Sequence, residues 1–231
     1  MMDRFLRQTM IDGFGEQGQS LLKRSSVLIV GLGGLGAPVS SYLVSAGVGK
    51  IGLCDKDVVS ETNLQRQILY TEEDVSKKKT DCALSHLSAM SSNTIFKVYP
   101  NGLTDDNAQD MISDYDVIMD CTDNFIVRLL IDNVCRRLGK PWIHGSIDTS
   151  YGCVTVFNHT KGKSLHDLYN DISELSYQPS NIIGTFGPVV GMVGSIQAME
   201  AIKLISGYGE ILDGTLLTID LKDLSFAKYQ F

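Results

Sequence analysis

The chain has 231 residues, of which 43% are hydrophobic and 20% are charged, and its formal net charge is −7. This size suits one domain with a real core, and the negative charge argues against a nucleic-acid surface, which needs clustered Lys and Arg. The sequence contains no linker, repeat or low-complexity run, and no apolar run approaches the ~20 residues that cross a bilayer. We therefore expect one domain over residues 1–231 of a soluble, cytoplasmic protein that binds neither nucleic acid nor membrane.

The first strand, turn and helix can be read directly from the residues. Residues 27–30 form an apolar run typical of a strand buried on both faces, and the glycines of "GLGGLG" follow at once. Pro38 suits the first turn of the helix that comes next. Residues 51–54 form the second strand, and Asp55 stands at its end.

The alternation of helices and strands continues to the C-terminus. Helices are expected over residues 76–90, 104–112, 124–138 and 188–205, and strands over residues 94–99, 116–120, "PWIHGSI", "GCVTVF", "TLLTID" and "SFAKYQF". This order predicts a doubly wound, Rossmann-like α/β sheet that is mostly parallel and becomes mixed towards the C-terminus. Residues 158–183 are expected to form a long crossover loop.

The glycine-rich turn predicts a nucleotide site. Glycines let the backbone approach phosphates, and the following helix offers free N–H groups at its N-terminus. Asp55 is placed to accept hydrogen bonds from ribose hydroxyls. Such turns also serve tight packing of a helix on a strand, but the strand, helix and strand around this one favour a nucleotide.

Two cations near this turn indicate chemistry on phosphates rather than hydride transfer. Arg66, within "NLQRQ", can hold phosphate oxygens through two parallel hydrogen bonds, and Lys79 can add a point charge from the start of the next helix. The plainer alternatives are a surface salt bridge for Arg66 and a solvated helix face for Lys79, which ends a run of three lysines.

Asp123 falls just past the strand that ends at Asp120. This is the edge at which doubly wound sheets bind ligands. Asp123 suits the N-cap of the following helix, and it also suits a magnesium site, because Mg²⁺ prefers one or two carboxylates together with substrate oxygens. The two interpretations are compatible.

Together these motifs resemble the ThiF/MoeB/HesA family, the bacterial relatives of ubiquitin-activating enzymes. The resemblance covers nearly the whole chain through "RFLRQ", "VLIVGLGGLG", "SAGVG", "NLQRQILY", "DCTDN" and "GPVVGMVGSIQAMEAIKLISG". It implies an ATP site made by Gly34, Asp55, Thr62, Asn63, Leu64, Gln65, Arg66, Lys79, Asp123 and Asn124. It also implies a homodimer in which Arg7 of "RFLRQ" reaches the active site of the other subunit.

The resemblance further implies that ATP and Mg²⁺ are used to adenylate the C-terminal glycine carboxylate of a small β-grasp sulfur-carrier protein similar to ThiS or MoaD. ATP and the carboxylate carry about −5, and Mg²⁺, Arg66, Lys79 and Arg7 would supply about +5, so positioned cations should do most of the catalysis. Asp123 would hold the magnesium. The crossover loop at residues 158–183 would close over the tail of the carrier.

Thiamine thiazole synthesis with a ThiS-like carrier is the preferred pathway. Activation of a MoaD-like carrier for molybdopterin synthesis and adenylation of a short peptide are the alternatives within the family. From other classes, an NAD-dependent oxidoreductase leaves Arg66, Lys79 and Asp123 without a role, and a non-catalytic scaffold for a β-grasp partner does not need this charged set.

Two departures from the family pattern change what is expected. Most members bind structural zinc through two CxxC pairs, whereas the five cysteines here are scattered, and His159 and His166 alone cannot build a tetrahedral site, so no zinc is expected. Several relatives carry a cysteine before the "GPVVG" helix where this chain has Ser180, which puts thiol chemistry in question but leaves adenylation intact. Cys54 and Cys121 end apolar strands and are expected to be buried packing residues.

Overall fold

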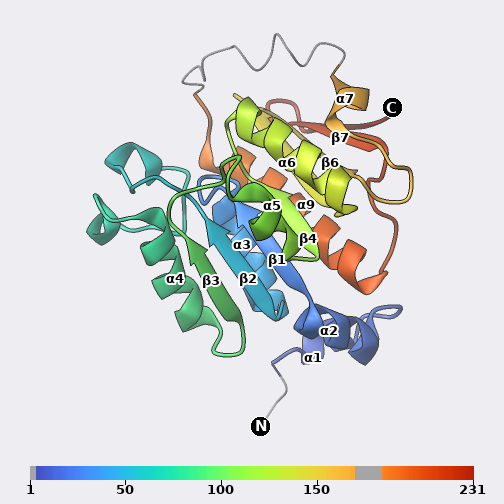
Figure 1. The fold of residues 1–231 in the computed structure, drawn as a ribbon, viewed down its shortest axis with the longest axis horizontal. Helices are drawn as coiled ribbons and strands as arrows, with labels where there is room; N and C mark the ends of the chain where they lie inside the picture. Colours follow the sequence, from blue (N-terminus) through green and yellow to red (C-terminus); the bar gives the residue numbers. More distant parts are fainter. Residues whose placement is uncertain (1–3, 170–183) are drawn as a thin grey trace.

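All eight strands belong to one sheet in the computed structural model of the protein, which describes residues 4–169 and 184–231 (Figure 1). The strand order is β3-β2-β1-β4-β5-β6-β7-β8. Their bounds are β1 Ser26–Val30, β2 Lys50–Cys54, β3 Ile95–Tyr99, β4 Val117–Asp120, β5 Trp142–Asp148, β6 Tyr151–Phe157, β7 Thr215–Asp220 and β8 Ser225–Gln230. Pairs from β3 to β5 are parallel and pairs from β5 to β8 are antiparallel, which confirms the mixed, doubly wound sheet.

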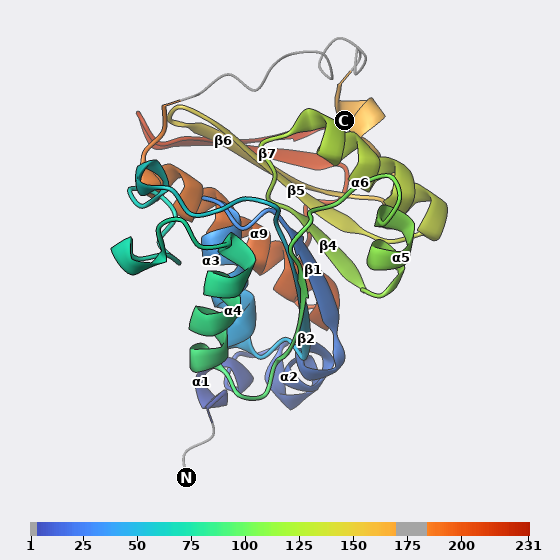
Figure 2. The same cartoon turned by 60° about the vertical axis from the view of Figure 1, so that its left-hand side comes forward.

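Helices cover both faces of the sheet, and each face has its own apolar core. One face carries α3 (Gly36–Ala46), α4 (Lys79–Met90) and α9 (Gly187–Ser206), and the other carries α5 (Ala108–Ser113) and α6 (Phe125–Leu138) (Figure 2). The shorter elements are α1 (Leu6–Thr9), α2 (Gly15–Arg24), the 3₁₀ turns η1 (Glu61–Asn63) and η2 (Glu72–Asp74), and α7 (Leu165–Leu168).

The expected elements are present, but two helices begin later than expected and the expected crossover contains a short helix. The helix expected over residues 76–90 begins at Lys79, and the one expected over residues 104–112 begins at Ala108. Within the predicted crossover at residues 158–183, α7 forms one short helix. Residues 170–183 of this crossover, which include Ser180, lie outside the described residues. The closing of the crossover over a substrate therefore stays a prediction.

The helix α9 corrects one statement made from the sequence. It has 20 residues, and an 18-residue stretch of it has a mean hydropathy of 1.3, so one apolar segment does reach the length and composition of a membrane span. In this fold α9 packs against α3 and β5 and contributes Val190, Val193 and Ala198 to the core. Its apolar character is therefore explained by packing inside the domain.

The register of the central strands brings the expected site residues to one edge. Val30 of β1 pairs with Cys54 of β2 on one side and with Asp120 of β4 on the other. The segments that follow these three residues therefore leave the sheet at the same level. Because β1 is the point at which the strand order reverses, this carboxyl edge is where such sheets bind ligands.

Candidate nucleotide site

Two glycines of the turn between β1 and α3 are required by the backbone. Gly31 has a φ of +92°, and a Cβ there would lie 2.5 Å from the carbonyl oxygen of Cys121. A Cβ on Gly36 would overlap the carbonyl oxygen of Gly31. At Gly34, a Cβ would lie 3.0 Å from the side chain of Val190 in α9. The turn therefore serves tight packing of helices on strands, and this does not conflict with a phosphate site above it.

Asp55 anchors this turn. One carboxylate oxygen, Oδ2, accepts a hydrogen bond of 2.7 Å from the N–H of Leu32, and the other, Oδ1, accepts one of 2.8 Å from the N–H of Asp57. Each oxygen keeps a second lone pair, so a ribose hydroxyl could still be bound. The structure therefore gives Asp55 a structural role, and ribose binding stays a prediction.

Lys79 lies inside the protein rather than on a solvated face. Its side chain is 7% exposed, and its Nζ lies 3.1 Å from Oδ2 of Asp57 and 4.0 Å from Oδ2 of Asp55. The two lysines before it are exposed, as a solvated run would be. The plain interpretation of the lysine run is thus wrong for Lys79, which is held at the carboxyl edge by two carboxylates.

Residues 62–66 form a turn beside the start of α9. In the capping box of η1, Oδ1 of Asn63 accepts a hydrogen bond of 3.1 Å from the N–H of Ser60. Gln65 donates from Nε2 to the carbonyl of Thr185, 3.4 Å away, just before α9 begins. Leu64 packs against the core of that face. Asn63, Leu64 and Gln65 therefore support the turn from within.

Arg66 carries the positive charge of this turn. Its Nη1 donates to the carbonyl of Thr62 at 3.0 Å, and the side chain is half-buried. Among the described residues, no carboxylate lies within ion-pair distance of its guanidinium. The surface salt bridge considered from the sequence is thus not formed there, and most of the donors of Arg66 can take an anion.

Gln67, the last residue of "NLQRQ", lies beside the glycine turn and was not singled out from the sequence. Its side chain is buried, and its Nε2 lies 3.4 Å from the position a Cβ on Gly33 would occupy. Its Oε1 has no hydrogen-bond partner among the described residues. An unpaired buried amide oxygen is costly, and a donor from a bound molecule would remove that cost. Its position inside the motif was the available signal.

The turn between β4 and α6 carries Asp123 and Asn124. Oδ1 of Asn124 accepts hydrogen bonds from the N–H groups of Ile126 and Val127, at 2.9 and 3.2 Å. The N-cap role considered for Asp123 therefore belongs to Asn124. Asp123 is exposed and, within residues 4–169 and 184–231, makes no hydrogen bond or ion pair, so its carboxylate can bind a cation.

A buried charged group, here called the Asp120 cluster and made of Asp120, Thr122, Arg128 and His144, lies beneath this turn. Asp120 accepts hydrogen bonds from Nε of Arg128 at 2.8 Å, from Nδ1 of His144 at 2.7 Å and from Oγ1 of Thr122 at 2.7 Å. Burial alone would raise the pKa of Asp120, but the charge of Arg128 and these hydrogen bonds hold it far below its ordinary value. The ionised carboxylate therefore fixes the turn that carries Asp123.

Arg7 does not reach this site within one chain. Figures 1 and 2 show α1 beside α2, at the amino ends of the strands. Nε2 of Gln8 donates to the carbonyl of Ala46 at 3.1 Å, at the C-terminal end of α3. The glycine turn lies at the other end of this 11-residue helix, a span of about 16 Å. The exposed side chain of Arg7 could meet such a turn only in another copy of the chain.

The cysteines lie as expected. All five cysteines are free and buried, which confirms the packing role expected of Cys54 and Cys121. His159 and His166 are exposed. In the part of the chain that the structure describes, no three His, Cys, Asp or Glu side chains gather as a metal site, and the expectation of no zinc stays a prediction.

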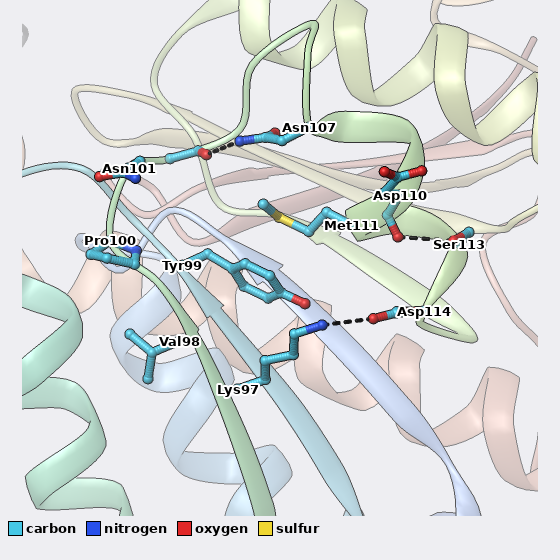
Figure 3. A pocket seen from close by; sticks show the side chains of 11 residues that line it. Lys97, Val98, Tyr99, Pro100, Asn101, Asn107, Asp110, Met111, Ser113 and Asp114 are labelled. Carbon is cyan, nitrogen blue, oxygen red and sulfur yellow. Dashed lines mark hydrogen bonds and ion pairs between the residues drawn. The ribbon is translucent and has the colours of Figure 1, made fainter.

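A separate hollow of about 460 Å³ lies between β3 and α5 (Figure 3). It is lined by residues such as Lys97, Tyr99 and Met111, and Nζ of Lys97 pairs there with Oδ2 of Asp114 at 2.8 Å. None of the site residues expected from the sequence lines it. Its position therefore adds nothing to the nucleotide site.

Fold and site together define a nucleotide-binding α/β protein with cationic side chains at the carboxyl edge of its sheet. The chain belongs to the ThiF family, whose sequence profile matches residues 5–231. This confirms the family that the motifs indicated.

Named relatives give the class of enzyme. A sulfur carrier protein adenylyltransferase of Thermus thermophilus is 40% identical over 233 residues, covering 98% of this chain and 86% of that protein. The adenylyltransferase and sulfurtransferase MOCS3 of Culex quinquefasciatus is 41% identical, and the match covers 96% of this chain but only 51% of that longer protein. A probable molybdopterin-synthase adenylyltransferase of Gracilaria tenuistipitata is 36% identical, and the match covers 98% of this chain and 64% of that protein. This chain is accordingly an adenylyltransferase.

Solved structures confirm the fold. The crystal structure of E. coli MccB with AMPCPP and MccA has a TM-score of 0.84 at 23% identity, covering 99% of this chain and 71% of that one. The structure of PaaA has a TM-score of 0.83 at 23% identity, and the match covers 98% of this chain and 72% of that one. At this identity the likeness shows the fold alone.

Proposed function

We propose that this enzyme uses ATP and Mg²⁺ to adenylate the C-terminal carboxylate of a small ubiquitin-like sulfur-carrier protein, in thiamine thiazole biosynthesis. One observation carries the proposal: a buried lysine, an arginine and an exposed aspartate lie along one glycine-floored edge, and neither the arginine nor the aspartate has an ion-pair partner among the described residues. An oxidoreductase has no use for this set. The Thermus relative, named for a sulfur carrier, supports the choice of substrate.

The residues present suit the charges of that reaction. Arg66 would bind phosphate oxygens through the donors it does not use on Thr62, and Asp123 would bind magnesium. When bound, the magnesium would neutralise charge on the phosphates. Lys79 is already paired with Asp55 and Asp57, so the sum of about +5 overstates the positive charge on offer. Positioning by these residues, rather than net charge alone, must therefore account for catalysis.

The position of Arg7 supports a homodimer. This side chain lies at the far end of α3 from the glycine turn of its own chain, so it can act only on another subunit. A cytoplasmic location is also proposed, and the five free thiols support it because such thiols suit a reducing compartment.

Exchange of labelled pyrophosphate into ATP tests the reaction. Exchange should depend on Mg²⁺ and on the carrier, and Arg66→Ala or Asp123→Ala should abolish nearly all of it while circular dichroism stays unchanged. Arg136→Ala and Asp105→Ala are the matched controls, because both residues are exposed and lie outside the site. Their pyrophosphate exchange should equal that of the wild type. Undiminished exchange in both site variants would exclude the assignment.

The substrate is tested in parallel reactions. A ThiS-like carrier, a MoaD-like carrier and a short peptide are offered separately, because the algal relative is named for molybdopterin synthase and a fold neighbour was solved with MccA. Exchange only with the MoaD-like carrier or only with the peptide would replace the thiamine assignment. A thermal shift with NAD but not with Mg-ATP would support the oxidoreductase instead.

Mixing two inactive variants tests the shared site. In a mixed dimer of Arg7→Ala and Arg66→Ala chains, one of the two sites has both arginines intact. Random mixing should therefore restore about a quarter of wild-type exchange. No recovery, with mixed dimers shown to form, would contradict the placement of Arg7 in the other subunit's site.

A further inference from the structure

A short antiparallel pairing places Asp57 beside Lys79. Val58 and Lys78 form the bridge of this pairing. Next to it, the N–H of Lys79 donates to the carbonyl of Asp57 at 3.0 Å. The side chains of the same two residues also meet, because Nζ of Lys79 donates to Oδ2 of Asp57 at 3.1 Å. Asp57 therefore holds both the backbone and the ammonium group of Lys79.

Asp57 is tied in turn to the glycine-rich turn. Its N–H donates to Oδ1 of Asp55 at 2.8 Å, and Oδ2 of Asp55 accepts from the N–H of Leu32 at 2.7 Å. On the other side, the hydroxyl of Tyr70 donates to the carbonyl of Leu32 at 2.8 Å and lies 3.5 Å from the carbonyl oxygen of Lys79. A continuous line of hydrogen bonds thus fixes Lys79 relative to the turn before any ligand binds.

The contact with Asp57 holds the ammonium group without using it up. Nζ of a lysine carries three N–H groups. Among the described residues, only Asp57 lies within hydrogen-bond distance of this Nζ, since Oδ2 of Asp55 is 4.0 Å away. The other N–H groups remain for phosphate oxygens. A lysine stem is long and flexible, so a group that fixes its end removes disorder that the reaction would otherwise have to overcome.

We propose that Asp57 is a positioning residue for adenylyl transfer that acts through Lys79, by holding its ammonium group where negative charge develops on the phosphates. This role rests on the proposed function, in which Lys79 meets the phosphates of ATP. Asp57 was not among the site residues expected from the sequence. Two other roles are open to its carboxylate, whose side chain is 57% exposed: a purely structural ion pair and a direct ligand for magnesium. The experiments below separate the three.

The contact itself is tested without substrate. The free protein is treated with N-hydroxysuccinimidyl acetate, and acetylation of each lysine is followed by mass spectrometry. Lys79 should react about tenfold slower than its exposed neighbour Lys78 or slower still, and Asp57→Asn should speed its reaction about threefold or more. Asp114→Asn, which removes the exposed partner of Lys97, should leave the rate at Lys79 unchanged. Unchanged protection of Lys79 in Asp57→Asn would overturn the proposal, whatever the reaction of the enzyme.

A double-mutant cycle tests whether Asp57 acts through Lys79. Pyrophosphate exchange is compared in Asp57→Asn, Lys79→Met and the double variant. Asp57→Asn alone should lower kcat about tenfold or more and change KM for ATP less than about twofold, because the lost contact orients a group that acts in the transition state. In the Lys79→Met background the same change should have no further effect. A full tenfold loss in that background would show an independent role, as a magnesium ligand would have, and no loss in either background would leave only a structural pair.

A conservative variant checks the ionic nature of the tie. Asp57→Glu keeps the charge at a half-exposed position with room for one more methylene, so it should retain about a third of wild-type exchange or more, with circular dichroism unchanged. Exchange no better than that of Asp57→Asn would contradict an ionic tie. Absence of exchange in the wild type with every acceptor would instead contradict the proposed function, while the acetylation rates would still decide whether Asp57 holds Lys79.

Discussion

Asp120→Asn is the substitution whose cost follows most directly from the structure. The new amide keeps the shape of the carboxylate but removes the charge that neutralises Arg128, and its NH₂ group faces donors. Arg128 is itself buried, so its charge is left without an anionic partner. Removing one partner of a buried ion pair costs about 3–5 kcal/mol. At about 2–4 °C per kcal/mol for a chain of this size, the melting temperature should fall by about 6–20 °C.

Asp114→Asn is the matched control. Asp114 pairs with Lys97 at 2.8 Å, the same distance as Asp120 from Arg128, but these side chains are 43% and 51% exposed. Water already solvates this pair, so its loss should leave stability unchanged. Urea unfolding can be followed through Trp142, the one tryptophan, which is buried 5.9 Å from the ring of His144. Equal losses in the two variants would refute the argument from burial.

The pH dependence gives an independent check on the same residues. The pKa of Asp120 is lowered in the folded chain, so its contribution is present above the unfolded value of about 3.9 and is lost as pH falls further. The pKa of His144 is raised, so its contribution is present below the unfolded value of about 6.5 and is lost as pH rises through the folded value. The difference in stability between wild type and Asp120→Asn should therefore be largest between about pH 4 and 6.5.

Three further outcomes are expected. Asn124→Ala removes the N-cap of α6 and should cost about 0.5–2 kcal/mol in urea unfolding, whereas Asn133→Ala, exposed within the same helix, should cost nothing. Gly36→Ala should prevent stable folding because its Cβ overlaps backbone, whereas Gly191→Ala in α9, where a Cβ meets open space, should stabilise by about 0.5–1 kcal/mol. Lys79→Met should lower pyrophosphate exchange about 100-fold or more, measured at saturating ATP.

For each of these three predictions, one result would contradict the structural argument. Equal unfolding midpoints for the two asparagine variants would mean that the cap is not needed. A soluble Gly36→Ala protein with a wild-type melting curve would mean that the turn can relax. For Lys79, exchange matching that of Lys78→Ala, its exposed neighbour, would make its burial irrelevant to the reaction.

The sequence predicted the strands and the helices well where local pattern and tertiary packing agree. The apolar run at residues 27–30 became β1 at nearly the same bounds. The start of α4 was placed three residues too early because residues 76–78 carry no local stop signal. There Ser76 has a φ of +71°, and Lys78 is extended and forms a bridge with Val58. That long-range pairing overrides a run of good helix formers.

The site could be predicted only in part for a similar reason. The motifs identified Asp55, Arg66 and Asp123 because each follows a recognisable strand or turn. They could not show that Lys79 is buried while its two neighbours are exposed, since a run of three lysines has no internal signal. Nor could they reveal His144 as a partner of Asp120, because the two residues are separated by 24 positions and meet only through strand pairing.

The unequal pairing of β5 has a consequence for how this scaffold can diversify. Only residues 142–144 of β5 pair with β4, whereas all of its seven residues pair with β6. The last part of the hairpin therefore projects past the parallel sheet, and its tip at Thr149 accepts a hydrogen bond of 2.8 Å from Oγ1 of Thr185. Insertions at this tip would reshape one flank of the edge without disturbing the strands that hold the glycine turn. Evolution could thus change which substrate receives the adenylyl group without changing the residues of the nucleotide site.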